Sequence, residues 1–261
     1  TMHAMSRREA YLLAGPTASG KSAAAALLAR ARGAAILSAD SMLVYRGMDV
    51  GTAKPSREER EEFSMGGVDI VTPAEHFSSG AWLRAAAAWL AEIPASRPIV
   101  IVGGTGLYFS ALLRGLDQRW TNPPPEYPVL QVERSVLHAR IAQRLDTMFL
   151  EGLAAEVRSL REQYPVWSDT ASAAIGYKEF IDGLSPEVVR EKILVRTRQL
   201  AKRQDTWFRH QSTPLYVPIG ETAEETAARV ERVWNEHGPW RVSLPESPDE
   251  AVVKPDVNDK E

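Results

Sequence analysis

Short apolar runs alternate with longer amphipathic stretches along the first half of the chain. The short runs are closed by polar or glycine turns, and their all-apolar character is typical of strands buried on both faces. The longer stretches carry the spacing and end signals of helices. We expect strands at 10–14, 35–38 and 99–102, and helices at 22–32 and 81–92. This alternation predicts an α/β fold, in which a parallel sheet is flanked by helices.

Four prolines within residues 119–128 interrupt this pattern, because a helix cannot continue through them. Beyond them, residues 132–163 are mostly helical in pattern, and Ser185 followed by a proline predicts the start of a second long helix. Residues 215–218 predict the last strand. We therefore expect four segments: an α/β core over 6–118, a proline-rich linker over 119–131, a helical part returning to the core with a last strand over 132–244, and a disordered acidic tail over 245–261.

Composition excludes several classes of protein. The 261 residues carry 31 basic and 34 acidic side chains and no cysteine, so a disulfide framework, a thiolate metal site and a cysteine nucleophile are all excluded. The five histidines show no ligand spacing. No run approaches the roughly 18 apolar residues that span a bilayer. We expect a monomeric, cytoplasmic protein with no membrane partner.

Residues 15–22, here called the phosphate loop, read Gly-Pro-Thr-Ala-Ser-Gly-Lys-Ser. Two glycines separated by four residues and followed by Lys-Ser let successive N–H groups converge on one anion, at the positive end of the following helix. Lys21 adds a full charge, and Ser22 can place its hydroxyl on Mg²⁺. A chance glycine turn is the weaker interpretation, because a strand precedes this loop and a helix follows it. The pattern predicts a P-loop NTPase-like core.

A phosphate loop identifies the group that is held and leaves the reaction open. Hydrolysis, kinase chemistry and departure of a diphosphate all remain possible at this point. A phosphate-loop ATPase usually has an acidic residue after a later strand to hold Mg²⁺. Here the strand at 99–102 runs into Gly103-Gly104-Thr105-Gly106, without a carboxylate. This lowers the expectation of ATP hydrolysis.

Two polar residues follow neighbouring strands of the predicted sheet. Asp40 comes after the strand at 35–38, at the edge where α/β sheets bind ligands, so it could be a general base or the cap of a turn. Thr105 could cap the next helix or donate its hydroxyl to a phosphate oxygen. The residues alone leave both alternatives open.

Several motifs together resemble the tRNA dimethylallyltransferase family. They are the phosphate loop, residues 40–55 (DSMLVYRGMDVGTAKP), residues 103–108 (GGTGLY), residues 176–178 (GYK) and residues 196–204 (RTRQLAKRQ). The resemblance covers roughly residues 10–115 and 145–210, in the family's order. It implies transfer of a dimethylallyl group from its diphosphate to N6 of the adenine next to the anticodon of a tRNA, at position 37.

The same resemblance implies roles for the ambiguous residues. Asp40 would accept the N6 proton, Thr105 would contact the diphosphate end of the donor, and the phosphate loop would hold the leaving diphosphate together with Mg²⁺. The expected diphosphate-binding residues are Gly15, Thr17, Ala18, Ser19, Gly20, Lys21, Ser22 (also the Mg²⁺ ligand) and Arg198. The expected tRNA-binding residues are Asp40, Ser41, Met42, Leu43, Thr105, Gly176, Tyr177, Lys178, Lys202, Arg203 and Gln204.

Residues 190–209 form a basic helix, with seven basic and two acidic side chains. At about 100° per residue, basic rows flank an apolar stripe on both sides. Charge alone favours a solvated surface face. The family motif reverses that preference and implies that Arg198, Lys202 and Arg203 contact RNA or diphosphate.

One departure from the family pattern is visible between residues 116 and 136, where usual members carry a longer helical insertion that grips the anticodon stem. Here the insertion is shortened or lost. Three alternatives therefore stay open: prenylation of free adenine nucleotides, a small-molecule phosphate-loop kinase, and an RNA-binding module without catalysis.

Overall fold

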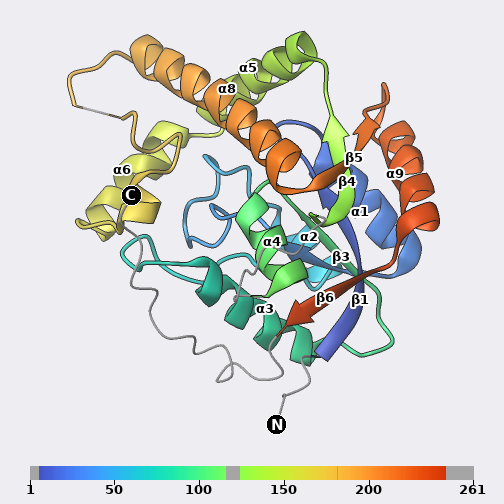
Figure 1. The fold of residues 1–261 in the computed structure, drawn as a ribbon. Coiled ribbons are helices and arrows are strands. Elements are labelled where there is room, and N and C mark those ends of the chain that lie inside the picture. The colour runs from blue at the N-terminus through green and yellow to red at the C-terminus, as the bar shows by residue number, and fades with distance from the viewer. Residues whose placement is uncertain (1–5, 116–123, 181, 245–261) are drawn as a thin grey trace.

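Six strands form one sheet in the structure, a computed structural model that describes residues 6–115, 124–180 and 182–244. The strand order is β2-β3-β1-β4-β5 with parallel pairing, and β6 pairs antiparallel with β1 (Figure 1). The strands are β1 (Ser6–Ala14), β2 (Ala35–Ser38), β3 (Ile99–Gly103), β4 (Glu126–Gln131), β5 (Thr213–Pro218) and β6 (Trp240–Leu244). The expected fold class is confirmed.

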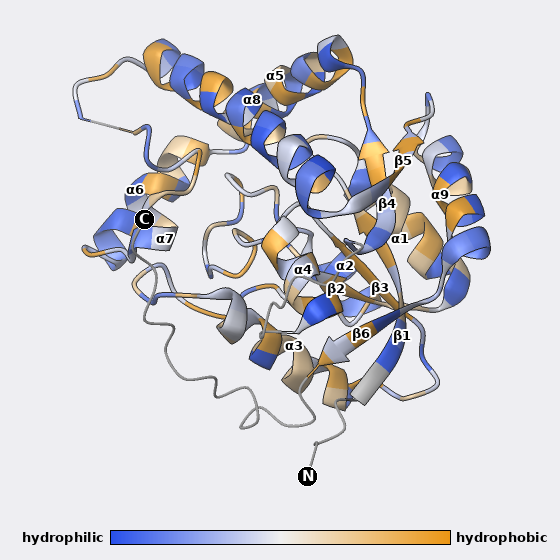
Figure 2. Ribbon diagram, in the orientation of Figure 1, coloured by the Kyte–Doolittle hydropathy of each residue, from blue (hydrophilic) through white to orange (hydrophobic). Residues whose placement is uncertain are grey.

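Helices cover both faces of the sheet. Successive residues of a strand point to opposite faces, so Leu12 of β1 packs in one apolar cluster and Leu13 in the other. Figure 2 shows hydrophobic residues along β3 and β4, and a mixture of hydrophobic and hydrophilic residues along the helices around them. The longer helices are α1 (Lys21–Arg32), α3 (Ser79–Glu92), α5 (Arg134–Leu150), α6 (Leu153–Gln163), α8 (Pro186–Gln211) and α9 (Ala223–His237). The shorter ones are α2 (Arg57–Glu62), α4 (Gly106–Arg114) and α7 (Asp169–Ser172).

The predicted helix starts agree with the structure. Ser185 caps α8, because its hydroxyl accepts a hydrogen bond from the Val188 N–H at 3.3 Å. Strands β2 and β3 are buried along their whole length, as their apolar runs predict. Helices α5 and α8 are separated along the chain but pack against each other. Both also reach the loops at the carboxyl end of the sheet.

Two strand predictions were wrong. Residues 126–131, expected in the linker, form β4, which pairs with β5 over its whole length and with β1 at Val129. Proline interrupts a helix, but a strand tolerates it where the missing N–H is not needed for pairing. The side chains of Tyr127 and Val129 in this strand are buried. Residues 215–218 belong to β5 but are not the last strand, because β6 follows. The rest of the expected linker, 119–123, and the expected tail, 245–261, lie outside the described residues.

Candidate active site

The phosphate loop connects the end of β1 to the start of α1, as predicted. Gly20 is the residue before α1 and has φ = +89°, a left-handed conformation that favours glycine. A Cβ on Gly15 would lie 2.9 Å from the buried Ser19 hydroxyl. The N–H groups of Lys21 and Ser22 belong to the first turn of α1 and have no acceptor within the helix. The loop is therefore shaped to present N–H donors to an anion.

Lys21 has charged neighbours of both signs. Burial lowers the pKa of its ammonium group to about 8, while nearby Asp40 opposes this shift and Arg144 adds a smaller lowering. Its Nζ donates to the Pro16 carbonyl oxygen at 3.2 Å. An anion bound next to Lys21 would oppose this lowering of the pKa, because it would stabilise the charged form.

Two arginines of α5 also lie at the phosphate loop, and we did not predict either from the sequence. Arg140 donates to the Ser19 carbonyl oxygen at 3.2 Å. Arg144 donates to the Thr17 hydroxyl at 3.4 Å and to the Thr52 carbonyl oxygen at 3.3 Å, and burial lowers the pKa of its guanidinium. Their spacing of four residues places them on the same face of a helix, which was the available signal. Only the fold brings that face to the loop.

Asp40 caps a turn and faces a cavity at the same time. One carboxylate oxygen, Oδ1, accepts from the Met42 N–H at 2.8 Å. The residue also lines a cavity of about 340 Å³, here called the Thr105 cavity, together with Lys21 and Arg144. The two interpretations of Asp40 are therefore compatible, since its second oxygen, Oδ2, is not used by the turn.

Thr105 does not cap α4 through its side chain. Its hydroxyl instead accepts from the Ser41 N–H at 2.9 Å, and its own N–H donates to the Ala39 carbonyl oxygen at 3.1 Å. These two bonds join the turn after β3 to the turn after β2. Thr105 and Asp40 consequently line the same cavity.

A second cavity of about 640 Å³, here called the Ser22 cavity, adjoins the first. Both cavities are lined by Lys21, Asp40 and Arg144. Of the other predicted residues, Ser22 and Leu43 line the Ser22 cavity, and Ser41, Met42, Gly176 and Arg203 line the Thr105 cavity. The carboxylate and the anion cradle thus line the same two cavities.

Gln204 holds the two loops together. Its side-chain oxygen accepts from the Thr17 N–H at 2.9 Å, and its nitrogen donates to the Gly104 carbonyl oxygen at 3.2 Å. Both ends of the amide are engaged in this way, so the side chain expected to bind RNA has a structural role here. The Thr17 N–H, expected to bind diphosphate, is occupied by the same bond.

Tyr177 is also not at the surface, although we expected it to bind RNA. Its side chain is buried, its hydroxyl donates to Glu156, and a Cβ on Gly51 would lie 2.6 Å from its ring. Glu156 in turn accepts from the backbone N–H groups of residues 49–51, at 2.7–3.3 Å. This part of the motif therefore shapes the loop beside the cavity. Lys178, next to it, is exposed.

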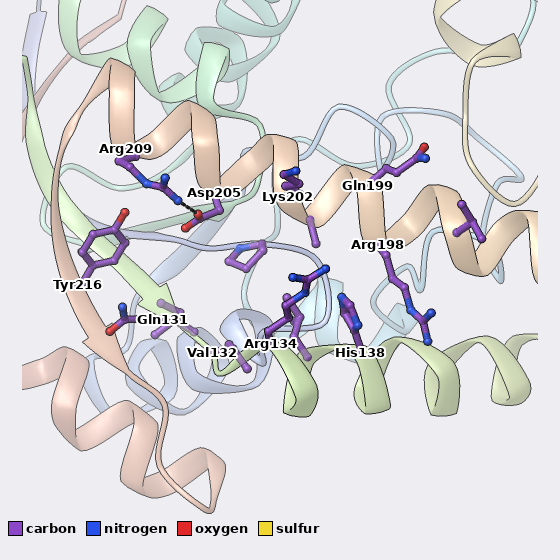
Figure 3. Close-up of a pocket in the computed structure, with 15 residues that line it drawn as sticks. Gln131, Val132, Arg134, His138, Arg198, Gln199, Lys202, Asp205, Arg209 and Tyr216 are labelled. Carbon is purple, nitrogen blue, oxygen red and sulfur yellow. Dashed lines mark hydrogen bonds and ion pairs between the residues drawn. The ribbon is translucent and has the colours of Figure 1, made fainter.

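The basic residues of α8 divide between two sides of the helix. Arg203 lines the Thr105 cavity, while Arg198 and Lys202 line a separate groove between α5 and α8 (Figure 3). Arg198 does not line the Ser22 or the Thr105 cavity, but Pro16 of the phosphate loop lines the same groove as Arg198. The binding of diphosphate by Arg198 stays a prediction. Helical geometry explains the division, because Arg198 and Lys202 share one face and Arg203 lies on the next.

In the described ranges, no helix is long and apolar enough to cross a membrane. Nor do the described residues contain a group of three His, Cys, Asp or Glu side chains that could hold a metal ion.

Comparison with known proteins places this geometry in a family. The model of the IPP transferase family matches residues 43–129 and 118–211, and the isopentenyl transferase model matches residues 8–64. The two IPP transferase segments meet in the stretch where we expect a shortened insertion.

Individual relatives agree. A tRNA dimethylallyltransferase of Burkholderia ambifaria is 32% identical over 311 aligned positions, covering 87% of this chain and 95% of the relative. One of Azoarcus sp. is 34% identical, covering 77% and 87%. The first alignment is longer than this whole chain, so that relative has residues that this chain lacks.

Solved structures show the same fold. A tRNA isopentenylpyrophosphate transferase of Staphylococcus epidermidis superposes with a TM-score of 0.74 at 26% identity, covering 88% of this chain and all of that one. The corresponding protein of Bacillus halodurans gives 0.69 at 27% identity, with the same coverage. The chain therefore belongs to the tRNA dimethylallyltransferase family.

Proposed function

We propose that this protein transfers the dimethylallyl group of dimethylallyl diphosphate to N6 of the adenine next to the anticodon of a tRNA. The observation that carries this proposal is that Asp40 and Lys21 line the same two cavities. A carboxylate that can take a proton therefore faces a cradle that can take a leaving anion. The names of the relatives supply the substrate pair.

The acceptor side of the reaction needs a base. An exocyclic adenine amine is a poor nucleophile, and it loses a proton as the new C–N bond forms. Asp40 Oδ2 is the group that takes this proton, while Oδ1 stays bonded to the Met42 N–H and fixes the orientation of the carboxylate. Thr105 is held against the same turn by Ser41, and its position next to Asp40 lets it contact the donor.

The donor side needs positive charge. The allylic C–O bond breaks, its electron pair stays with the diphosphate oxygen, and the positive charge of the allyl unit is taken up by the adenine nitrogen. Lys21, Arg140 and Arg144 are the cations around the phosphate loop that stabilise the departing diphosphate. Because they are fixed before the reaction, little reorganisation is needed as the charge develops.

Mg²⁺ fits the donor set of this site. The Ser22 hydroxyl lines the cavity beside Lys21, and Mg²⁺ usually keeps several waters and takes one or two protein oxygens besides phosphate. When bound, Mg²⁺ would neutralise part of the diphosphate charge.

The test supplies radiolabelled dimethylallyl diphosphate, Mg²⁺, and either unmodified tRNA or AMP. We expect label on tRNA, and strongly slowed transfer by Asp40→Ala and by Thr105→Ala. Asp146→Asn is the matched control, because this exposed carboxylate of α5 pairs with Arg190 at 2.7 Å and lines neither cavity. Label on AMP alone would assign the chain to free-nucleotide prenylation. ATP turnover with a small alcohol and no label on either acceptor would identify a kinase.

The third alternative, an RNA-binding module without catalysis, predicts a different result. The Asp40→Ala protein would then keep the biological activity of the wild type, and no labelled product would form. The expected monomeric state stays a prediction, which size-exclusion chromatography with light scattering would check.

A further inference from the structure

The groups that would act on the donor and on the acceptor belong to two different turns. The phosphate loop follows β1, whereas the turn that carries Thr105 follows β3 and is bonded to the turn of Asp40. A backbone hydrogen bond runs from the Gly15 N–H to the Gly103 carbonyl oxygen, at 3.3 Å. Both strands end at this point. Further contacts must therefore fix the spacing between the anion cradle and the carboxylate.

Gln204 of α8 joins the two turns. Its Oε1 atom accepts from the Thr17 N–H at 2.9 Å, and its Nε2 atom donates to the Gly104 carbonyl oxygen at 3.2 Å. A side-chain amide carries an acceptor and a donor on one rigid plane, so it can make both bonds at once. A Cβ on Gly104 would lie 3.0 Å from the Gly15 carbonyl oxygen and closer still to Gln204. The two turns and the amide are therefore in close contact.

Helix α8 is docked against α4 one turn beyond Gln204. Phe208 is fully buried, and its ring meets the edge of the Phe109 ring of α4 with the centroids 6.3 Å apart. The Trp207 ring packs so closely on Gly106 that a Cβ there would lie 1.9 Å from it. Because α4 directly follows the Thr105 turn, these contacts fix the backbone of α8 relative to that turn. Gln204 is consequently a spacer of set length between a fixed helix and the phosphate loop.

This bridge takes a hydrogen-bond donor away from the anion cradle. A phosphate loop binds its anion through converging N–H groups, and Thr17 lines both cavities at the loop. Its N–H is nevertheless bonded to Gln204. The apolar contacts of Trp207 and Phe208 already dock α8, so the docking of the helix does not explain the bridge. A role in the reaction does.

We propose that Gln204 is a positioning residue that sets the distance between the diphosphate in the phosphate loop and the carboxylate of Asp40. This inference rests on the proposed function, because the distance matters only if a donor and an acceptor react across it. Reacting atoms must be held about 3–3.5 Å apart and aligned, and a displacement of about 1 Å can cost about a hundredfold in rate. Gln204 acts on this alignment by keeping the phosphate loop in register with the Thr105 turn.

The family resemblance implies a different role for Gln204, namely contact with RNA. The two roles differ in the quantity that they affect. An RNA contact contributes to the affinity for tRNA even when no donor is present. A spacer contributes to the rate of transfer after both substrates are bound, and its removal leaves both affinities close to those of the wild type. The freed Thr17 N–H could then donate to the diphosphate.

The test compares the wild type with two variants. Gln204→Met keeps the length of the side chain but makes neither hydrogen bond, and Gln204→Asn keeps the amide on a shorter chain that cannot span both turns. With tRNA and dimethylallyl diphosphate both saturating, we expect each variant to lower kcat by about tenfold to a hundredfold. The Kd for tRNA without donor and the Kd for dimethylallyl diphosphate without tRNA should stay close to the wild-type values.

Gln163→Met is the matched control, because this exposed glutamine at the end of α6 lines neither cavity. It should keep the wild-type kcat and both wild-type affinities. Circular dichroism melting curves establish that each variant is folded. If Gln204→Met does not fold, Gln204→Asn carries the same comparison.

The outcomes separate this inference from the proposed function. The proposed function fails if the wild type places no label on tRNA. If the wild type labels tRNA and both Gln204 variants keep its kcat, the inference is overturned while the proposed function stands. If Gln204→Met weakens tRNA binding but keeps kcat at saturation, Gln204 is an RNA contact and the inference is wrong. The inference is also wrong if the affinity for dimethylallyl diphosphate falls and kcat is kept, because Gln204 would then only shape the loop for binding.

Discussion

Raising the pH from 7 to 9 is expected to weaken the binding of dimethylallyl diphosphate about tenfold through a single group, Lys21. The pKa of this lysine is lowered to about 8 in the free protein, because burial penalises its charged form. At pH 9 most free molecules therefore carry a neutral Lys21. The bound diphosphate needs the charged form, so binding must first add a proton, and the cost of that proton grows with pH.

The size of the effect follows from the pKa shift. Above pH 8 each further pH unit lowers the affinity by about a factor of ten, because one pKa unit corresponds to about 1.36 kcal/mol. The loss stops when the bound form also deprotonates. If the anion restores the pKa of Lys21 to its ordinary value of 10.5, the largest possible loss is about 300-fold. Below pH 7 the affinity should hardly change through this group.

Isothermal titration calorimetry without tRNA measures this binding while no transfer occurs. At pH 8.5, buffers of different ionisation enthalpy should also reveal uptake of a proton on binding. Lys21→Arg is the control, because an arginine stays charged throughout this range and its binding curve should not change with pH, even if its affinity is lower. A wild-type affinity that is equal at pH 7 and pH 9, or an equal pH dependence in Lys21→Arg, would refute the reasoning.

Three further changes test contacts that shape the site. Glu156→Gln should lower the free energy of unfolding by about 1–3 kcal/mol in urea titrations and slow transfer, because an amide N–H₂ would face the donors of residues 49–51; wild-type stability would contradict this. Gly106→Ala should cost about 1–3 kcal/mol or more by thermal unfolding, because its Cβ would lie 1.9 Å from the Trp207 ring. Trp234→Phe should cost about 1–3 kcal/mol, since its buried indole N–H donates to the Leu12 carbonyl oxygen at 2.7 Å; an unchanged melting curve would count against that bond.

Local sequence signals were enough to predict the centre of the fold. Strands β2 and β3 are continuous apolar runs between turns, and a Ser-Pro pair marks the N-terminus of α8. The signals were insufficient for β4 and β6. The proline within β4 is also typical of a linker, so the strand was not predicted. Strand β6 forms by antiparallel pairing with residues more than 200 positions earlier in the chain. Such long-range pairing leaves little trace in a short segment.

The site follows the same division. The phosphate loop, Asp40 and Thr105 each belong to a compact motif at a strand end, so their shared location follows from the parallel sheet. Arg144 reaches the loop from a helix more than 120 residues away in sequence. Tyr177 belongs to a recognisable motif, yet its role depends on the buried partner Glu156. The motifs therefore located residues near the cavities but not the direction in which their side chains point.

The turn after β3 leaves no room for a side chain at Gly103 and holds Thr105 in place. A Cβ on Gly103 would lie 2.1 Å from the Ala39 carbonyl oxygen, so no side chain fits at this strand end. A phosphate-loop ATPase commonly holds Mg²⁺ there with a carboxylate. The close approach is needed in this protein, because the Ala39 carbonyl oxygen accepts from the Thr105 N–H and the Thr105 hydroxyl accepts from the Ser41 N–H. The close contact at Gly103 leaves no room for the carboxylate of an ATPase. The hydrogen bonds of the same turn hold Thr105 beside Asp40.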